Sequence, residues 1–224
     1  IRDYKVTGVQ TCALPILLTL SPLPIPERIL HYLTGSNDLD EPLLGLFESL
    51  AASVEPPPSH QALVERLLQL WSQKEGLRRG ILLCGADGAS KVAIAAAAAR
   101  HMGLELHRLH GADLPSSAAE REALIRLWER EAILKGSILL LECETEERGE
   151  LARALRFVER LRSPLVVLSR EPLPTERRTL YRLDVPQPSR TEQKFLWESA
   201  LGASAAHFHG QLEPLVMQFN LSAP

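Results

Sequence analysis

The stretch GILLCGADGASKVAI, residues 80–94, contains the pattern on which our interpretation of the fold depends. Its first residues, 80–84, form an apolar run that predicts a buried strand, and a helix is predicted over 90–103. Gly85 and Gly88 lie in the turn between them, where a backbone without side chains can approach a bound group closely. A strand, a glycine turn and a helix in this order indicate a loop whose backbone amides can surround an anion.

A loop that binds the phosphates of a nucleotide also needs a lysine for the outer charge and a hydroxyl that holds magnesium. Lys91 stands at the lysine position, but Ser90 replaces a glycine and Val92 replaces the serine or threonine. Asp87 adds a negative charge beside the polyanion. The loop by itself therefore leaves two interpretations open, a structural turn between a strand and a helix that needs no nucleotide, and a nucleotide-binding loop that has lost its metal ligand. The candidate residues of this loop are Gly85, Ala86, Asp87, Gly88, Ala89, Ser90, Lys91 and Val92.

The second candidate motif is ILLLECE, residues 138–144, in which an apolar run ends in acidic residues. In nucleotide hydrolases with phosphate-binding loops, an acidic residue orients magnesium-bound water, and a second group positions the attacking water. Glu142 takes the first position and is the candidate magnesium ligand, but Cys143 cannot replace a carboxylate at the second. Alternation along a strand places Glu144 on the face opposite to Cys143. We therefore assign no catalytic residue, and solvated acidic residues after a core strand are the alternative.

From residue 80 onward, predicted strands alternate with predicted helices. Strands at 104–111, 137–144, 163–171 and 177–186 follow the first one, with helices at 115–136 and 148–162 between them. This alternation is typical of an α/β fold with three layers, in which helices cover both faces of a parallel sheet of five strands. Ser169 lies near the end of the strand at 163–171 and is the candidate for contact with a terminal phosphate. Capping of a strand end is the alternative for this serine.

The segments on either side of this α/β core, 61–188, are predicted to be mainly helical. Residues 17–54 contain two amphipathic stretches, the second carrying Leu43, Leu44, Phe47 and Leu50 at helical spacing. The prolines of EPPPSH, residues 55–60, indicate a linker, and a helix is predicted over 61–75. After residue 188, a capped helix at 189–202 begins a second helical segment, 189–224.

Composition excludes several classes of protein. The net charge of −3 argues against an electrostatic nucleic-acid or membrane-surface binder, and no apolar run is long enough to cross a bilayer. The three cysteines have no metal-like spacing, which argues against a zinc site or a disulfide framework. Together with a hydrophobic content of 45% and a charged content of 24%, these features predict a cytoplasmic globular protein.

The first sixteen residues, IRDYKVTGVQTCALPI, differ in composition from the rest of the chain. They resemble the translation of a common short-read sequencing adapter over their whole length, so we exclude them from the interpretation of the fold. A signal peptide is the less suitable alternative because the segment has no long apolar core after its basic residues. We expect the native N-terminus to be missing and the helical segment after residue 188 to be truncated.

Taken together, these residues resemble the AAA-type ATPase family. GADGASKV resembles its Walker A loop, ILLLECE its Walker B strand and VVLSRE its first sensor strand. RLDVPQPSRTEQKFLWESAL resembles the passage from the last core strand into the helical lid. More narrowly, ERILHYLTGSNDLD and MQFNLS are similar to bacterial proteins with tandem AAA modules, in which a winged-helix region precedes a degenerate first module.

The resemblance implies a module that binds ATP weakly at most, with or without magnesium, and does regulatory or structural work inside a larger ATPase. The expected partners are other AAA modules of the same chain or the subunits of a ring. Two alternatives remain at this point. One is an active ATPase module that uses Glu142 or Glu144 in unusual roles, and the other is a protein-interaction domain that binds no nucleotide.

Overall fold

The computed structural model describes residues 25–36, 38–51, 55–73, 79–145 and 147–202. The chain divides into two compact parts, residues 1–37 and 38–224. In the first part the described element is the helix α1 (Glu27–Leu33), which agrees with the first predicted amphipathic stretch. The adapter-like residues 1–16 and the end of the lid segment, 203–224, lie outside the described residues. The other described helices and strands belong to the second part.

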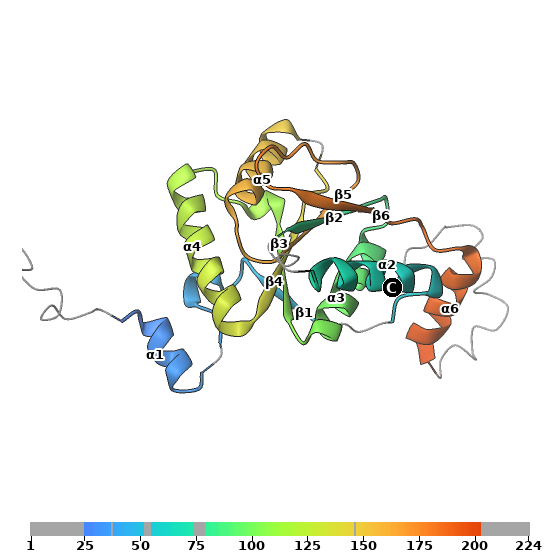
Figure 1. The fold of residues 1–224 in the computed structure, drawn as a ribbon, viewed down its shortest axis with the longest axis horizontal. Helices are drawn as coiled ribbons and strands as arrows, with labels where there is room; N and C mark the ends of the chain where they lie inside the picture. The colour runs from blue at the N-terminus through green and yellow to red at the C-terminus, as the bar shows by residue number, and fades with distance from the viewer. Residues whose placement is uncertain (1–24, 37, 52–54, 74–78, 146, 203–224) are drawn as a thin grey trace, which may run out of the picture. The chain divides into compact units, whose positions relative to one another are not determined.

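The second part is built on one sheet of six strands (Figure 1). Its strands are β1 (Glu48–Leu50), β2 (Gly80–Cys84), β3 (Glu105–His110), β4 (Ser137–Glu142), β5 (Leu165–Ser169) and β6 (Leu180–Asp184). They lie side by side in the order β1-β3-β4-β5-β2-β6, and all neighbours are parallel except β1, which runs antiparallel to β3. The predicted α/β class is confirmed, but the predicted number of five strands needs correction because β1 adds a sixth.

The sixth strand comes from residues that the sequence pattern assigned to a helix. Residues 41–43 form only a short 3₁₀ turn, η2 (Glu41–Leu43), and β1 then pairs with β3 in the register Glu48↔Arg108. Gly45, with φ at +85°, has a left-handed backbone that ends any helix there. The open edge of β3 supplies hydrogen-bond partners to the next residues of the chain, so the long-range pairing prevails over the local helical spacing.

Helices cover both faces of the sheet (Figure 1). The helices α2 (Pro58–Trp71) and α3 (Gly88–Met102) pack with Ile81 and Leu83 of β2 on one face. The helices α4 (Ala118–Lys135) and α5 (Arg148–Arg160) pack with Leu82 and Cys84 on the other. Alternate residues of β2 thus enter two different apolar cores, as expected for a strand buried on both faces. The predicted arrangement of three layers is confirmed.

Two shorter elements complete the part that the structure describes. The 3₁₀ turn η4 (Gly111–Asp113) follows β3, and the helix α6 (Arg190–Leu201) follows β6. Helix α2 begins at Pro58, three residues before the predicted start at 61, because a proline in the first helical turn needs no hydrogen-bond partner for its nitrogen. Among the described helices, none is long and apolar enough to cross a membrane.

The order of the strands brings the candidate motifs together. The chain leaves β2 through α3 and reaches β3, which is separated from β2 by β4 and β5. Because these strands are parallel, the residues that follow β2, β4 and β5 all emerge at the carboxyl edge of the sheet. The loop at 85–92, the acidic residues at 142–144 and Ser169 therefore share one edge.

Candidate functional site

The loop after β2 begins at a glycine that the fold itself requires. Gly85 has φ at +152°, and a Cβ atom there would lie 2.4 Å from the backbone oxygen of Val185. Its backbone nitrogen donates a hydrogen bond to the carbonyl oxygen of Ser169 at 3.2 Å. Close packing against the chain after β6 thus accounts for this glycine without any bound nucleotide.

Asp87 and Ser90 form the N-terminal cap of α3. The backbone N–H of Ser90 donates to Oδ1 of Asp87 at 3.4 Å, and the Ser90 hydroxyl donates to Oδ2 at 2.6 Å. Both side chains are buried. The serine that stands in place of a glycine therefore pairs with the aspartate that adds negative charge to the loop. Aspartate is one of the preferred residues at a helix N-cap, so the role of Asp87 could have been predicted from its place before the helix.

Lys91 is completely buried between β2 and β5, with 0% of its side chain exposed. Its ammonium group donates to the carbonyl oxygen of Gly85 at 2.8 Å and to that of Ser169 at 3.0 Å. A third contact is an ion pair with Oε1 of Glu144. An ammonium group has three N–H donors, so these three acceptors use all of them.

The acidic partner of Lys91 is therefore Glu144, to which the sequence analysis gave a role only under the alternative of an active ATPase module and which it did not include among the candidate site residues. Strand β4 ends at Glu142, so the alternation that holds within a strand does not determine where Glu144 points. The Glu142 carboxylate instead faces β3, with Oε2 3.1 Å from Nδ1 of His110 and 4.0 Å from the guanidinium of Arg108. The structure thus does not bring Glu142 together with Lys91.

Cys143 lies in the apolar core beneath the same edge and is 2% exposed. Burial, together with the nearby carboxylates of Glu150 and Glu142, raises the pKa of the Cys143 thiol to about 12. A thiol with such a pKa is protonated at neutral pH and is no base. The prediction that Cys143 cannot take the place of a water-positioning carboxylate agrees with this environment.

The remaining predicted residues supply little polar chemistry. Val92 is partly buried and packs against the apolar core that α2 and α3 share. Its hydrocarbon side chain has no oxygen that could bind a metal. Ser169 is buried, and it reaches Lys91 through its backbone carbonyl. Ala86 is exposed, whereas Gly88 and Ala89 are half-buried in the first turn of α3.

These positions do not fit a bound magnesium ion. Val92 provides no ligand, and Glu142 is turned toward His110. Within the described ranges, no group of three or more His, Cys, Asp or Glu side chains is placed to hold a metal ion. The predicted magnesium role of Glu142 stays a prediction without support from the donor set.

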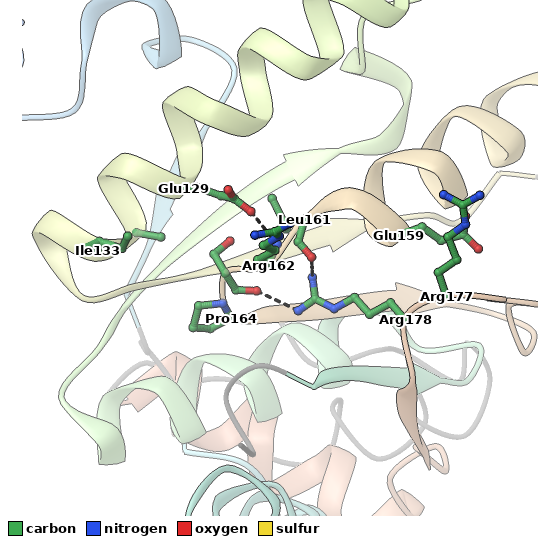
Figure 2. A pocket seen from close by; sticks show the side chains of 10 residues that line it. Glu129, Ile133, Glu159, Leu161, Arg162, Pro164, Arg177 and Arg178 are labelled. Atoms are coloured by element: carbon green, nitrogen blue, oxygen red, sulfur yellow. Dashed lines mark hydrogen bonds between the residues drawn. The ribbon is translucent and has the colours of Figure 1, made fainter. Parts of the chain in front are cut away.

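A separate cavity of about 700 Å³ opens where β5 and β6 begin, at the end of the sheet opposite to the candidate loop and beside the ends of α4 and α5 (Figure 2). Arg178 extends along it and donates from its two terminal nitrogens to the backbone oxygens of Leu161 and Ser163. Burial lowers the pKa of Arg178 to about 10. Because this guanidinium is held by backbone carbonyls, it serves to hold the chain before β6 in place.

Helix α6 is tied to the α/β part by Glu192. The Ser189 hydroxyl and the Glu192 carboxylate form a reciprocal capping box, and Glu192 Oε1 also accepts the backbone N–H of Ser59 in α2 at 2.9 Å. Burial alone would raise the pKa of Glu192, but the hydrogen bonds from Ser59 and Ser189 lower it to about 2. Nearby, Nε2 of His60 lies 2.9 Å from the carbonyl oxygen of Pro186.

Comparison with known proteins bears on this same helix. Residues 189–224 match the family model of the contractile injection system ATPase helical domain. Helix α6 is the described part of the matched stretch. No curated protein sequence matches the chain. The match supports an ATPase-related function, and it covers the segment that the sequence analysis identified as similar to a helical lid.

Proposed function

We propose that this chain is a degenerate AAA-type module of a larger ATPase, and that it binds ATP weakly at most and does not hydrolyse it. The observation that carries the proposal is the order of elements. A strand, a glycine turn and a helix with the buried Lys91 in its first turn are followed, after the rest of the sheet, by the segment that matches an ATPase helical domain. The match of residues 189–224 to the contractile injection system ATPase helical domain suggests that the larger ATPase is one associated with a contractile injection system.

The lack of hydrolysis is proposed from the missing groups. Metal-assisted phosphoryl transfer needs a magnesium ligand in the loop and a residue that orients the attacking water. Val92 has no oxygen, Cys143 is a buried and protonated thiol, and the Glu142 carboxylate faces β3. These three positions belong to two separate segments, so one substitution would not restore turnover.

The proposed partners are other modules of the same ATPase, either in one longer chain or in a ring of subunits, and the proposed location is a bacterial cytoplasm. The matched segment continues beyond α6, and Glu192 joins α6 to α2 through the backbone N–H of Ser59. This link would transmit a displacement of the helical segment to the α/β part. A regulatory or structural role in the assembly depends on such a connection.

A second candidate function is a protein-interaction domain that binds no nucleotide. The ion pair between Lys91 and Glu144 favours it, because the lysine is already neutralised within the chain. Under this proposal the loop is retained only as a packing element.

Isothermal titration calorimetry with ATP, on the full chain, separates the two candidates. Weak binding that is lost in Lys91→Ala but kept in Lys135→Ala is the expected result. Lys135 is the matched control because it lies at the end of α4 and pairs with Glu105 at the amino edge of the sheet. Absence of heat and of any thermal shift at millimolar ATP would refute nucleotide binding and favour the interaction domain.

Phosphate release tests the second part of the proposal. We expect the native chain and Lys91→Ala to release phosphate from ATP at the same background rate. A rate in the native chain that exceeds the rate in Lys91→Ala would show turnover and would refute the proposed loss of hydrolysis.

A further inference from the structure

The three acceptors around Lys91 leave its ammonium group no donor for a nucleotide. Two of them are the backbone carbonyls of Gly85 and Ser169, which lie at the carboxyl ends of β2 and β5. The third is the carboxylate of Glu144, on the segment between β4 and α5. A phosphate group can gain a hydrogen bond from Lys91 only by displacing one of these acceptors.

The Glu144 carboxylate also lies over the first turn of α3. A Cβ atom built on Gly88 would be 3.6 Å from both Oε1 and Oε2 of Glu144, and Gly88 is the first residue of the helix. A helix N-terminus favours a negative charge because its backbone N–H groups point outward. The carboxylate thus pairs with the lysine and lies beside the start of the helix, the two features that a phosphate-binding loop offers to a phosphate.

The two members of the ion pair differ in burial. Lys91 has no exposed side-chain area, whereas 21% of the Glu144 side chain is exposed. Glu144 can therefore turn into solvent and regain hydration, and Lys91 cannot. Asp87 remains in the loop in either case as the cap of α3, so the loop carries two carboxylates against one ammonium while Glu144 is bound.

We infer that the Glu144 carboxylate occupies the position of a nucleotide phosphate on Lys91 and is a built-in competitor of ATP. ATP enters the loop only after the Glu144 side chain has turned away from Lys91, so the position of this side chain controls access. The inference rests on the proposed residual ATP binding, and it assigns the regulation of that site to a residue of this chain. No covalent step is involved, because one anion replaces another.

Calorimetric titration of the full chain with ATP, with and without magnesium, tests this competition. The variants are Glu144→Gln, which removes the carboxylate charge, and Glu147→Gln, a control that removes the same charge from an exposed side chain three residues away. We expect Glu144→Gln to bind ATP about tenfold more tightly or better, the magnitude of one charge-assisted hydrogen bond. Glu147→Gln should stay within about twofold of the native chain.

A third variant guards against misfolding of Glu144→Gln. Glu144→Asp keeps the charge but shortens the side chain by one methylene group, which weakens the contact with Lys91. It should also bind ATP more tightly than the native chain, by a smaller factor. Melting curves without ligand establish that each variant is folded.

The outcomes separate this inference from the proposed function. Equal ATP affinity in the native chain, Glu144→Gln and Glu144→Asp would overturn the inference and leave the proposed ATP binding intact. Binding by the Glu144 variants alone would support the inference and refute ATP binding by the native chain. An absence of binding in every chain would overturn both.

Discussion

The ion pair between Lys91 and Glu144 predicts an asymmetric response to mutation in the absence of nucleotide. Lys91→Met removes the ammonium group and keeps most of the side-chain volume, and Glu144→Gln removes the carboxylate charge. If Lys91 serves only to bind a nucleotide, neither substitution should affect the stability of the free chain. If the pair is part of the folded structure, both should destabilise it, by different amounts.

The difference comes from the groups that each variant leaves behind. Glu144→Gln leaves an ammonium group with 0% exposure and no counter-charge, which costs about 3–5 kcal/mol. Lys91→Met leaves a glutamate that is 21% exposed and can be rehydrated. It deprives the Gly85 carbonyl of its partner, whereas the Ser169 carbonyl keeps the N–H of Gly85, so the cost is about 1–3 kcal/mol.

Urea unfolding of the full chain at pH 7, followed by circular dichroism, measures these free energies. The double variant Lys91→Met with Glu144→Gln leaves neither charge of this pair without its partner, and it should cost no more than Lys91→Met alone. The two substitutions are then coupled by at least the cost of Glu144→Gln alone, about 3–5 kcal/mol, because residues in contact do not contribute additively. A smaller cost for Glu144→Gln than for Lys91→Met, or strict additivity in the double variant, would refute the argument.

Three further predictions concern other parts of the fold. Trp128→Ala should lower the free energy of unfolding by about 3–5 kcal/mol because the indole is 0% exposed, and a loss below about 1 kcal/mol in urea unfolding would contradict its place in the core. The pKa of Glu192 is lowered from 4.5 to about 2 in the folded chain, so its carboxylate stabilises the fold above pH 4.5, and this contribution is lost as the pH falls toward 2. Glu192→Gln should therefore flatten the acid-unfolding curve between pH 4.5 and 2, while a curve identical to that of the native chain would show that the bonds to Ser59 and Ser189 contribute nothing. Cys143, with a pKa raised to about 12, should be alkylated by iodoacetamide at pH 8 only after unfolding, as peptide mass spectrometry can measure, and rapid labelling of the folded chain would place the thiol at the surface.

Much of the α/β core was predictable from local patterns. The apolar runs that became β2, β4 and β5 are each too long and too continuous for a half-exposed strand, so a sheet covered on both faces was the expected outcome. Helix α6 was predictable from its serine cap, which the Ser189 hydroxyl forms in the structure, whereas the Ser117 side chain at the start of α4 makes no capping bond. Strand β1 was not predictable, because its three residues pair with an edge that forms only in the folded chain.

The candidate site shows the same division between local and long-range information. The sequence by itself determined that Lys91 follows a strand and a glycine turn, and that Val92 and Cys143 cannot supply metal or base chemistry, since these properties belong to the residue types. The tertiary structure alone decided which acidic residue meets Lys91. Glu142 lies at the end of β4 and faces His110, whereas Glu144 lies beyond the strand, where the path of the chain and the charge of a lysine 53 positions away determine its place. The pairing with Glu144 matters because Lys91 is buried, and an ammonium group without access to water needs a counter-charge within the protein.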